Sequence, residues 1–568
     1  MKKLLSTMLS IVLAFSMFAG TALAESDVAF NDAGTFPVVQ DGSDIKLVVG
    51  TPEVATVTDY DDNHLTNYLR EKMGIQIDVQ LFDSSEFKTQ LQLMTSSGER
   101  LPDMLLNFNL TPTEREFYGT QGYFIDLLPY FDAHELTRYY DGEAISYLTD
   151  AEKETTISAG LSSNGALYAF PFWAVSVPDP WSNGLIINNT FCKALDMEIP
   201  TTIDEYYDYL VAVKTKDPNG NGIADEIPLV GFANSGNGDI IVNLLNSFTY
   251  YPDTWSGAAL CCDDEGKIYV PYQTEEFKEG IKFIAKLYSE GLISDLSFSQ
   301  DRYGLQAMVD VTGDTPDIVG SATSHRSYMF ASHNSAERRT HYTSIGPLVG
   351  PEGVAYAASY KVEPVYRHFI TADCEHPEVA FALLDFMTSS HCTLTARYGR
   401  EGEYWRYVTE EEAARGSSWA ELGYTDAMYT TSDMKLAWGQ QTNEIWNITS
   451  ITWQPQGFTA LTPAATDDSY PSDIAKYNSQ DWGAAIMARY GKAPKNLVGT
   501  LAYTQEEQAM LGTAEVDIGI YVRECMTRMV TGEMNIDAEW DSFQSNLKTM
   551  GIDTVISCAQ AAWDRANG

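Results

Sequence analysis

Strand-like apolar segments alternate with helical segments near the start of the chain, and this alternation restricts the fold more than any other feature. The run Ile45–Val49 is followed by a helical pattern over 63–73, an alternating strand pattern over 75–81 and a second helical pattern over 87–94. The next run, 102–107, is typical of a buried strand that ends in a polar residue. Strands that alternate with helices predict an α/β domain with a largely parallel sheet.

The carboxyl ends of parallel strands are where open α/β sheets bind their ligands. Asn107 and Asn109 stand at the end of the run 102–107, so both are candidate ligand contacts. A surface turn is the alternative interpretation of this polar pair.

The same types of segment continue to the end of the chain, which is long enough, at 568 residues, for two or more domains. Two further strand-like runs occupy 167–173 and 184–188, separated by a loop that contains Pro and Trp. Helical patterns occur at 203–214, 274–290, 377–389, 514–531 and 537–550, and resume near 555. No repeat of fixed period interrupts them.

The first 24 residues have the layout of a secretory signal peptide. Lys2 and Lys3 precede an apolar stretch, and small residues at Ala22 and Ala24 predict cleavage after Ala24. An uncleaved membrane anchor is the alternative, although the apolar stretch is short for a bilayer span. The polar segment 25–43 is expected to be a flexible leader.

The charge of the chain excludes some classes of partner. Its formal net charge of -43 would repel a phosphate backbone, so nucleic-acid binding is not expected, and anionic membrane surfaces are disfavoured for the same reason. The chain has seven cysteines, an odd number without a C-x-x-C motif, so a disulfide scaffold or a zinc site is not expected. Most of these cysteines are expected to be buried thiols, with one or two disulfides left open.

An acidic loop after the helical segment 203–214 carries the clearest local chemistry. With Asp217 as position one, oxygen-bearing side chains fall at positions one, three, five and nine, and Gly222 stands at six. This alternation is how an EF-hand-type loop wraps oxygens around calcium, and the glycine permits the sharp turn. The predicted structural calcium ligands are the side chains of Asp217, Asn219, Asn221, Asp225 and Glu226 and the backbone carbonyl of Ile223.

The loop departs from an EF-hand at position twelve, where Pro228 replaces the usual glutamate. Glu226, at position ten, could supply the missing carboxylate. The alternative is a polar turn without a metal, because Pro-Asn-Gly is strong turn chemistry by itself.

Several stretches, in order, resemble the family 1 extracellular solute-binding proteins of ABC importers, and the subgroup of large lipoproteins and alginate-binding proteins in particular. The first is Pro200–Tyr207 followed by Lys214–Gly222, which in that subgroup leads into a calcium loop. Others are Phe277–Ile281 with Lys286–Ile293, His376–Ala380, Tyr398–Gly402 and the tail from Gly532 to Trp563. The resemblance covers nearly the whole chain after the leader.

The resemblance implies a two-lobed α/β fold of the periplasmic-binding-protein type (type II), with a hinge of several segments between the lobes. It places the N-terminal lobe in 44–180 and 356–400 and the C-terminal lobe, with the calcium loop, in 181–355. Residues 401–568 would complete both lobes and the hinge. The ligand would be held in the cleft between the lobes.

Aromatic residues make up 12% of the chain, and their flat faces suit the C–H faces of sugar rings. Trp173 and Trp181 flank the expected first crossing between lobes, and Tyr404 and Trp405 follow the stretch Tyr398–Gly402. These four residues, with Asn107, are the predicted ligand contacts, and core packing is the alternative for each. Trp438, Trp446 and Trp453 are weaker candidates.

The resemblance implies a monomeric, non-enzymatic receptor that captures a carbohydrate and delivers it to the permease of an ABC transporter. A receptor of the same fold for peptides or other amphiphiles is one alternative, since fold does not fix the ligand. A secreted glycoside hydrolase is the other, although neither G-x-S-x-G nor a P-loop occurs. Turnover of an oligosaccharide would separate that enzyme from a receptor.

The expected location is outside the cytoplasm, in a periplasm or at a cell surface. Gram-positive members of the family are usually lipoproteins that carry a cysteine just after the signal peptide. Here Glu25 follows Ala24, and no cysteine occurs before Cys192, so the sequence predicts no lipid anchor.

Overall fold

The computed structural model describes residues 28–567, apart from 134–135, 175–178, 182, 234, 253–256, 325–329, 331–337, 339, 411–428, 432–440, 447–451, 456–457, 459–484 and 487. The chain forms two compact units, here called unit 1 and unit 2. The described residues of unit 1 fall within Met1–Ala174, Glu363–Tyr407 and Thr431–Phe458. Those of unit 2 fall within Val175–Val362, Val408–Thr430 and Thr459–Gly568. The predicted signal peptide lies outside the described residues.

Unit 1 is built on a five-stranded sheet with the order β2-β1-β3-β11-β4. Its strands are β1 (Lys46–Pro52), β2 (Gln76–Phe82), β3 (Met104–Leu105), β4 (Phe170–Phe172) and β11 (Val365–Ile370). β1 pairs in parallel with both β2 and β3, and β11 pairs antiparallel with both β3 and β4. Four strands therefore run in one direction and β11 alone runs against them, which confirms the largely parallel sheet.

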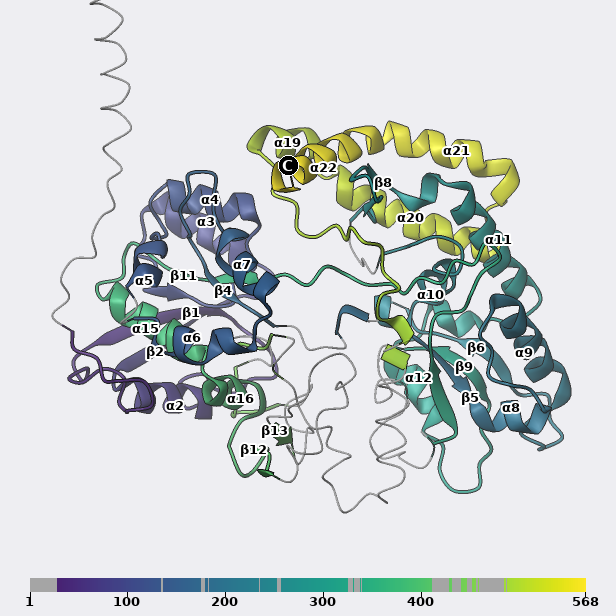
Figure 1. The fold of residues 1–568 in the computed structure, drawn as a ribbon, viewed down its shortest axis with the longest axis horizontal. Helices are drawn as coiled ribbons and strands as arrows, with labels where there is room; N and C mark the ends of the chain where they lie inside the picture. Colours follow the sequence, from purple (N-terminus) through teal and green to yellow (C-terminus); the bar gives the residue numbers. More distant parts are fainter. Residues whose placement is uncertain are drawn as a thin grey trace, which may run out of the picture. The chain divides into compact units, whose positions relative to one another are not determined.

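Helices cover both faces of this sheet. They are α2 (His64–Met73), α3 (Phe87–Ser97), α4 (Pro112–Thr120), α5 (Leu128–Asp132), α6 (Arg138–Gly142), α7 (Asp150–Ser158), α15 (Pro377–Met387) and α16 (Ser390–Tyr398). The connection from β1 to β2 and the connection from β2 to β3 run in opposite directions across the sheet. Right-handed crossovers then place α2 and α3 on opposite faces, as Figure 1 shows.

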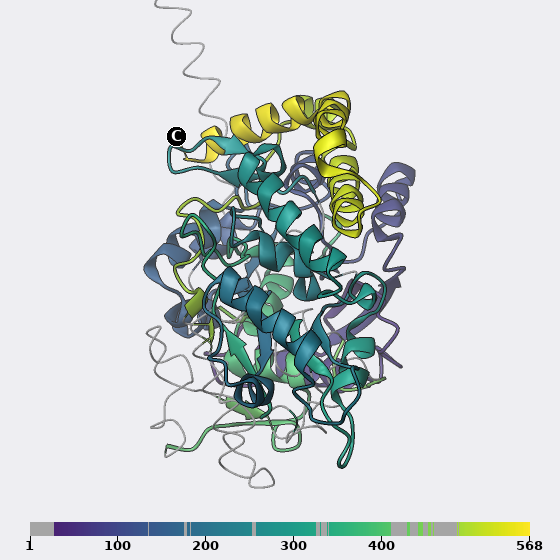
Figure 2. The same cartoon turned by 90° about the vertical axis from the view of Figure 1, so that its right-hand side faces the viewer.

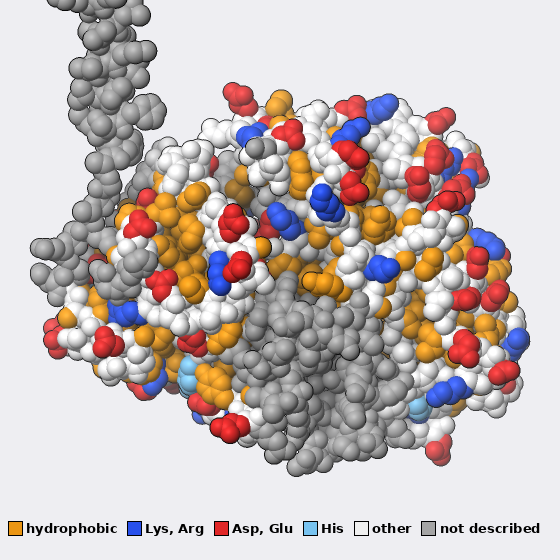
Figure 3. Space-filling view, viewed as in Figure 1, with side chains coloured by type: hydrophobic (Ala, Val, Ile, Leu, Met, Phe, Trp, Pro, Cys, Tyr) orange, Lys and Arg blue, Asp and Glu red, His pale blue; other side chains and the backbone are white. Residues whose placement is uncertain are grey.

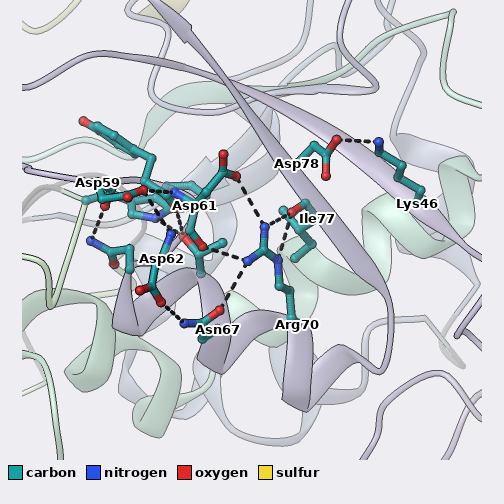
Figure 4. Close-up of polar contacts among 12 residues, drawn as sticks. Lys46, Asp59, Asp61, Asp62, Asn67, Arg70, Ile77 and Asp78 are labelled. Atoms are coloured by element: carbon teal, nitrogen blue, oxygen red, sulfur yellow. Dashed lines mark hydrogen bonds and ion pairs between the residues drawn. The ribbon is translucent and has the colours of Figure 1, made fainter.

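Polar contacts fix the start of α2 against the neighbouring strand. The Asp59 carboxylate accepts the backbone N–H groups of Asp61 and Asp62 (2.8 and 3.0 Å). From α2, the Arg70 guanidinium donates to the carbonyls of Asp61 and Ile77 (2.8 and 2.9 Å), and so ties the loop before the helix to β2 (Figure 4). Because each of these groups meets a local partner, this acidic turn has a structural role before α2, whose N-cap is Asn63.

Unit 2 has its own four-stranded sheet with the order β10-β5-β9-β6. Its strands are β5 (Leu185–Asn188), β6 (Ile227–Val230), β9 (Val319–Thr323) and β10 (Tyr342–Ile345). β6 and β9 are parallel, and β5 pairs antiparallel with β9 and β10. Once again three strands share one direction and a single strand, β5, runs against them.

The helices of unit 2 bury a large apolar cluster and smaller ones. They are α8 (Asn189–Leu195), α9 (Ile203–Lys216), α10 (Ile240–Leu245), α11 (Glu275–Ser289), α12 (Arg302–Val309), α19 (Gln505–Leu511), α20 (Ala514–Thr531), α21 (Ile536–Thr549) and α22 (Ile552–Asn567). On α11, Phe277, Ile281 and Ile284 recur on one face at helical spacing and are fully buried. This face packs against α20, and the C-terminal helices gather at one end of the unit (Figure 2).

In the part of the chain that the structure describes, four short strands lie outside the two main sheets. β7 (Cys261–Cys262) and β8 (Ile268–Tyr269) form an antiparallel hairpin in unit 2. β12 (Trp405–Tyr407) and β13 (Tyr429–Thr431) follow later in the chain.

The two reversed strands have the same origin. β11 is the first strand after the chain returns to unit 1 at Glu363, and β5 is the first strand after it enters unit 2 at Val175. β4 ends just before the chain leaves unit 1, so the chain leaves at the carboxyl ends of the parallel strands. A strand that re-enters at this edge must run in the opposite direction. In each unit the crossing segments are therefore attached at the carboxyl edge of the sheet.

The charged surface side chains and the burial of the cysteines agree with what the sequence indicates. On the face drawn in Figure 3, acidic side chains are scattered among basic ones over the described residues. All seven cysteines are described and carry free thiols, and six of them are buried, as expected for most of them. No helix among the described residues combines the length and apolarity that a membrane crossing needs.

Candidate functional site

The acidic loop begins where α9 ends. Asp217 caps the helix with a left-handed backbone (φ 47°), and Gly220 and Gly222 are left-handed as well (φ 70° and 80°). Glycine adopts this conformation without strain, whereas for Asp217 it is unfavourable unless local contacts compensate. The chain therefore coils tightly over the residues in which the sequence predicts metal ligands.

Side-chain oxygens hold this coil from within. The Asp217 Oδ2 accepts the backbone N–H of Gly222 (2.9 Å). Asn219 Oδ1 accepts the N–H of Asn221 (2.9 Å), and Asn221 Oδ1 accepts the N–H of Ile223 (2.7 Å). The bonds of Asn219 and Asn221 are successive Asx turns, in which a short polar side chain reaches the backbone two residues ahead, whereas that of Asp217 spans five residues. The Ile223 side chain is 60% exposed, so only its backbone is available to the loop.

Amide groups of the loop lie against its acidic side chains. The amides of Asn219 and Asn221 both lie against the Asp225 carboxylate (3.1 Å from Oδ1 and from Oδ2, respectively). Glu226 Oε1 accepts the N–H of Asn219 (3.3 Å). The Asp217 Oδ1 is buried and has no hydrogen-bond partner among the described residues. A buried carboxylate oxygen without a partner is costly, and a cation is one way to satisfy it.

The surroundings of one loop carboxylate, that of Glu226, disfavour its charged form. Burial raises the pKa of Glu226, and the neighbouring charges of Asp217 and Asp225 raise this pKa further. Among the described residues, no group of three or more His, Cys, Asp or Glu side chains has a metal-holding arrangement by itself. A cation in this loop would therefore also need the amide and carbonyl oxygens, which calcium accepts readily.

The loop is fixed to the segment that precedes β9. Asn219 Nδ2 donates to the carbonyl of Asp317 (3.1 Å), and the buried Asp317 carboxylate pairs with Arg338 (2.9 Å) and His341 (2.6 Å). A cavity of about 580 Å³ opens beside this cluster. The loop thus connects α9, β6 and the segment before β9 within unit 2. This position suits a structural role.

The carboxyl edge of unit 1 brings together two of the predicted ligand contacts. Asn107 follows β3 with a left-handed backbone (φ 64°), and its side-chain oxygen accepts a hydrogen bond from Arg367 of β11 (3.1 Å). Trp173 follows β4 at the same edge, but it is only 1% exposed and its indole N–H donates to Thr156 (3.1 Å). Asn107 is half-buried and keeps part of its side chain accessible.

The remaining predicted contacts are distributed over both units. Trp405 of unit 1 is 1% exposed and donates to the carbonyl of Gly399 (2.8 Å), whereas Tyr404 beside it is half-buried. Trp181 belongs to unit 2 and is 8% exposed. Of the weaker candidates, Trp446 and Trp453 are buried and Trp438 lies outside the described residues. The assignment of any of these residues to a ligand stays a prediction.

The carboxyl edge of unit 2 holds polar residues that the sequence did not single out. A small, partly open cavity of about 20 Å³ lies where β5 begins and β10 ends, and Asn183, Asn243 and Arg489 contribute to its lining. Burial lowers the pKa of Arg489 to about 10, so its guanidinium stays charged at neutral pH. These residues come from three distant segments, and no local motif marks any of them.

Comparison with known proteins agrees with this architecture. The family profile for bacterial extracellular solute-binding proteins matches residues 55–390. FusA of Streptococcus pneumoniae, a fructooligosaccharide ABC transporter substrate-binding protein, is 23% identical over 94% of this chain and 92% of its own. Lipoprotein LipO of Bacillus subtilis is 24% identical over 50% of each chain.

Solved structures share the fold at low sequence identity. The FusA structure with kestose superposes with a TM-score of 0.66 at 20% identity, over 92% of this chain and 99% of FusA. An extracellular solute-binding protein from Bifidobacterium longum subsp. infantis gives a TM-score of 0.71 at 20% identity, over 91% and 98% of the two chains. Alginate-binding protein AlgQ2 gives 0.59 at 20% identity, over 91% and 98%.

The family profile covers more than half of the chain, and the resemblance found in its sequence is thereby confirmed. The neighbouring structures have the periplasmic-binding-protein-like α/β fold that the resemblance implied. The chain belongs to the bacterial extracellular solute-binding proteins.

Proposed function

We propose that this protein captures an oligosaccharide outside the cytoplasm and delivers it to an ABC importer. The observation that carries the proposal is the similarity to FusA, which extends over 94% of this chain and 92% of FusA, so the likeness is not confined to one shared domain. FusA is named for fructooligosaccharide. The proposal extends to this chain the broader class, an oligosaccharide, and not one particular sugar.

Features within each unit support a binding role at the carboxyl edge of its sheet. At this edge unit 1 has the half-buried Asn107 and Arg367, and unit 2 has Asn183 and Arg489, which line a small cavity but are themselves nearly covered. Amide and guanidinium groups suit sugar hydroxyls, and aromatic faces suit sugar C–H groups. Three further aromatic residues, Trp173, Tyr404 and Trp405, are also proposed to contact the sugar. Their exposure in the ligand-bound protein tests this.

The acidic loop is proposed to hold a structural calcium ion. Its ligands would be the side chains of Asp217, Asn219, Asn221, Asp225 and Glu226 with the carbonyl of Ile223. The buried Oδ1 of Asp217, which has no partner among the described residues, and the pKa of Glu226, raised by burial and then by the charges of Asp217 and Asp225, both fit a bound cation. A structure of a FusA EF-hand mutant has the same fold (TM-score 0.65), which makes a loop of this kind consistent with the fold.

Thermal denaturation of the purified chain with an oligosaccharide panel, a peptide panel, calcium and a chelator tests these proposals together. A ligand that binds only the folded protein raises Tm. A rise with an oligosaccharide and none with peptides supports the carbohydrate role, and the opposite pattern contradicts it. A fall in Tm on chelation supports the calcium loop.

A further inference from the structure

One strongly exposed aromatic side chain lies at the carboxyl edge of unit 2. Tyr490, which directly follows Arg489, is 58% exposed. Its ring centroid is 6.2 Å from that of Trp181, with the two rings at 60°. Trp181 is almost entirely covered, so it serves as a backing for Tyr490 while the tyrosine ring stays accessible to solvent.

The segments that carry this aromatic pair are anchored. Next to Trp181, Asn183 donates to the carbonyls of Gly236 (2.6 Å) and Asp239 (3.0 Å) and accepts a hydrogen bond from Asn243 (2.7 Å). The segment therefore cannot shift without the loss of three hydrogen bonds. A side chain held on a fixed backbone loses less conformational entropy when it binds a ligand.

The residue before Tyr490 locks the second segment onto the first. Arg489 donates to the carbonyl of Ile345 at the end of β10 (3.2 Å). Its guanidinium lies so close to Gly184 that a Cβ atom there would be 1.9 Å from Nη2. Glycine at this position therefore allows the strand backbone and the buried guanidinium to pack against each other. Trp181 and Tyr490 are held next to each other by this contact.

We propose that Tyr490 is the stacking platform for one sugar ring of the bound oligosaccharide, backed by Trp181. The small cavity lined by Asn183, Asn243 and Arg489 would receive a ring hydroxyl or a bridging water, because about 20 Å³ is enough for one group of that size. The tyrosine supplies a flat apolar face and a hydroxyl at its edge, which are the two features that a sugar ring requires. This inference rests on the proposed oligosaccharide-binding function.

Tyr303 provides a matched control on the same unit. It is 59% exposed and lies on α12, a different segment from the one that carries Tyr490, and the guanidinium of Arg302 lies 4.6 Å from its ring centroid. One face of Tyr303 is thus already occupied. A tyrosine with equal exposure and a different location separates stacking at the site from the general effect of removing a surface ring.

The test is isothermal titration calorimetry of the full chain with the oligosaccharide that binds the wild type most tightly. Tyr490→Ala is expected to raise Kd by roughly tenfold, because one aromatic contact with the sugar is lost. Tyr490→Phe keeps the flat face and is expected to stay within about threefold of wild type, and Tyr303→Ala is expected to bind like wild type. Thermal denaturation of each variant shows whether it is folded at the titration temperature.

The inference is overturned if folded Tyr490→Ala binds like wild type, or if it and Tyr303→Ala lose affinity equally. An equal loss in Tyr490→Phe and Tyr490→Ala would assign the effect to the hydroxyl and would also overturn stacking. If the wild type binds no oligosaccharide, or binds only peptides, the proposed function itself fails. Failure of the inference and failure of the function therefore give different results.

Discussion

Asp217 combines two energetically unfavourable properties. It adopts a left-handed backbone at the end of α9, and its Oδ1 is buried without a partner among the described residues. The first property costs about 1–3 kcal/mol in a residue other than glycine, and the second adds the cost of desolvation. A calcium ion bound to this oxygen would offset both costs, so the calcium dependence of stability should be concentrated at this residue.

Asp217→Asn is therefore expected to abolish most of the effect of calcium on Tm. If calcium at one hundred times its Kd stabilises the wild type by about 2.7 kcal/mol, the variant should show only a small part of that stabilisation. Tm measured in calcium and in chelator checks this. Asp208→Asn, an exposed position on the same helix, is the control and should respond like wild type. An undiminished response in Asp217→Asn would contradict the ligand assignment.

Asp385 is a buried carboxyl group that caps another helix. Its two oxygens accept the N–H groups of Tyr139 (3.0 Å) and Tyr140 (2.8 Å) at the start of α6. Burial nevertheless raises its pKa to about 7, with the backbone hydrogen bonds and the charge of Arg138 acting in the opposite direction. The energetic cost of the buried charge thus exceeds the benefit of the cap.

Stability should accordingly fall as pH rises. The folded pKa of Asp385 is above the usual 3.8, so between about pH 4 and 7 the folded protein holds a proton that the unfolded chain has lost. Below this range the protonated carboxyl contributes its full stabilisation. As pH rises through the range this contribution is lost, and the free energy of unfolding falls by at most about 1.4 kcal/mol per pH unit. Asp385→Asn lowers stability by removing one acceptor, but it should flatten this slope. Urea denaturation of both proteins at pH 5, 6 and 7 measures the difference, and parallel slopes would contradict the raised pKa.

At the scale of elements, α20 depends on one close backbone contact. Gly519 lies within this helix, and a Cβ atom added there would be 2.2 Å from the carbonyl oxygen of Gly257. The oxygen belongs to the backbone, so it cannot rotate away as a side chain could. The gain in helix propensity from alanine, up to about 1 kcal/mol, is smaller than the cost of such overpacking.

Gly519→Ala should therefore lower the free energy of unfolding by about 1–3 kcal/mol, with a fall in Tm of several degrees. Gly142→Ala is a suitable control, since no atom lies within 4 Å of the added Cβ and the backbone is not left-handed. That variant should be neutral or slightly more stable. Equal Tm values for the two variants would show that the contact between α20 and Gly257 is looser than described.

The elements that could be predicted from the sequence are those with a local pattern. β1, α2, β2, α3 and β3 follow the predicted order, and the long helices α9, α11, α20 and α21 lie where apolar residues recur at helical spacing. α9 also has a capping box, in which Thr202 and Glu205 satisfy each other's backbone groups. Local periodicity is sufficient for such elements because each buries one face of its own.

The remaining features depend on residues far apart in the chain. The reversed direction of β5 and β11 follows from where the chain crosses between units, which no window of sequence contains. The short helices α5 and α6 have no full period of apolar residues to detect. Trp173 and Trp405 are of a residue type that suits sugar contacts, but the sequence cannot show that both side chains are nearly fully buried. Arg489 and Tyr490 gain their significance only beside Trp181, about 300 residues earlier.

At the scale of the whole molecule, both units follow one plan. Each has a mainly parallel sheet with a single reversed strand, and each attaches its crossing segments at the carboxyl edge. Polar and aromatic residues from distant segments collect at that edge in both units, where α/β sheets bind ligands. The acidic loop is elsewhere in unit 2, consistent with a structural ion and not with a ligand contact. This plan is the fold of a bacterial extracellular solute-binding protein, the family to which the chain belongs.

The most direct test of this account is a calorimetric titration of the purified wild-type chain, in calcium, with a panel of oligosaccharides and a panel of peptides. The account predicts saturable binding of an oligosaccharide at one ligand per chain, with the sugar recovered unchanged by chromatography and no heat from peptides. Binding of peptides alone, cleavage of the sugar, or no heat from any oligosaccharide would contradict it.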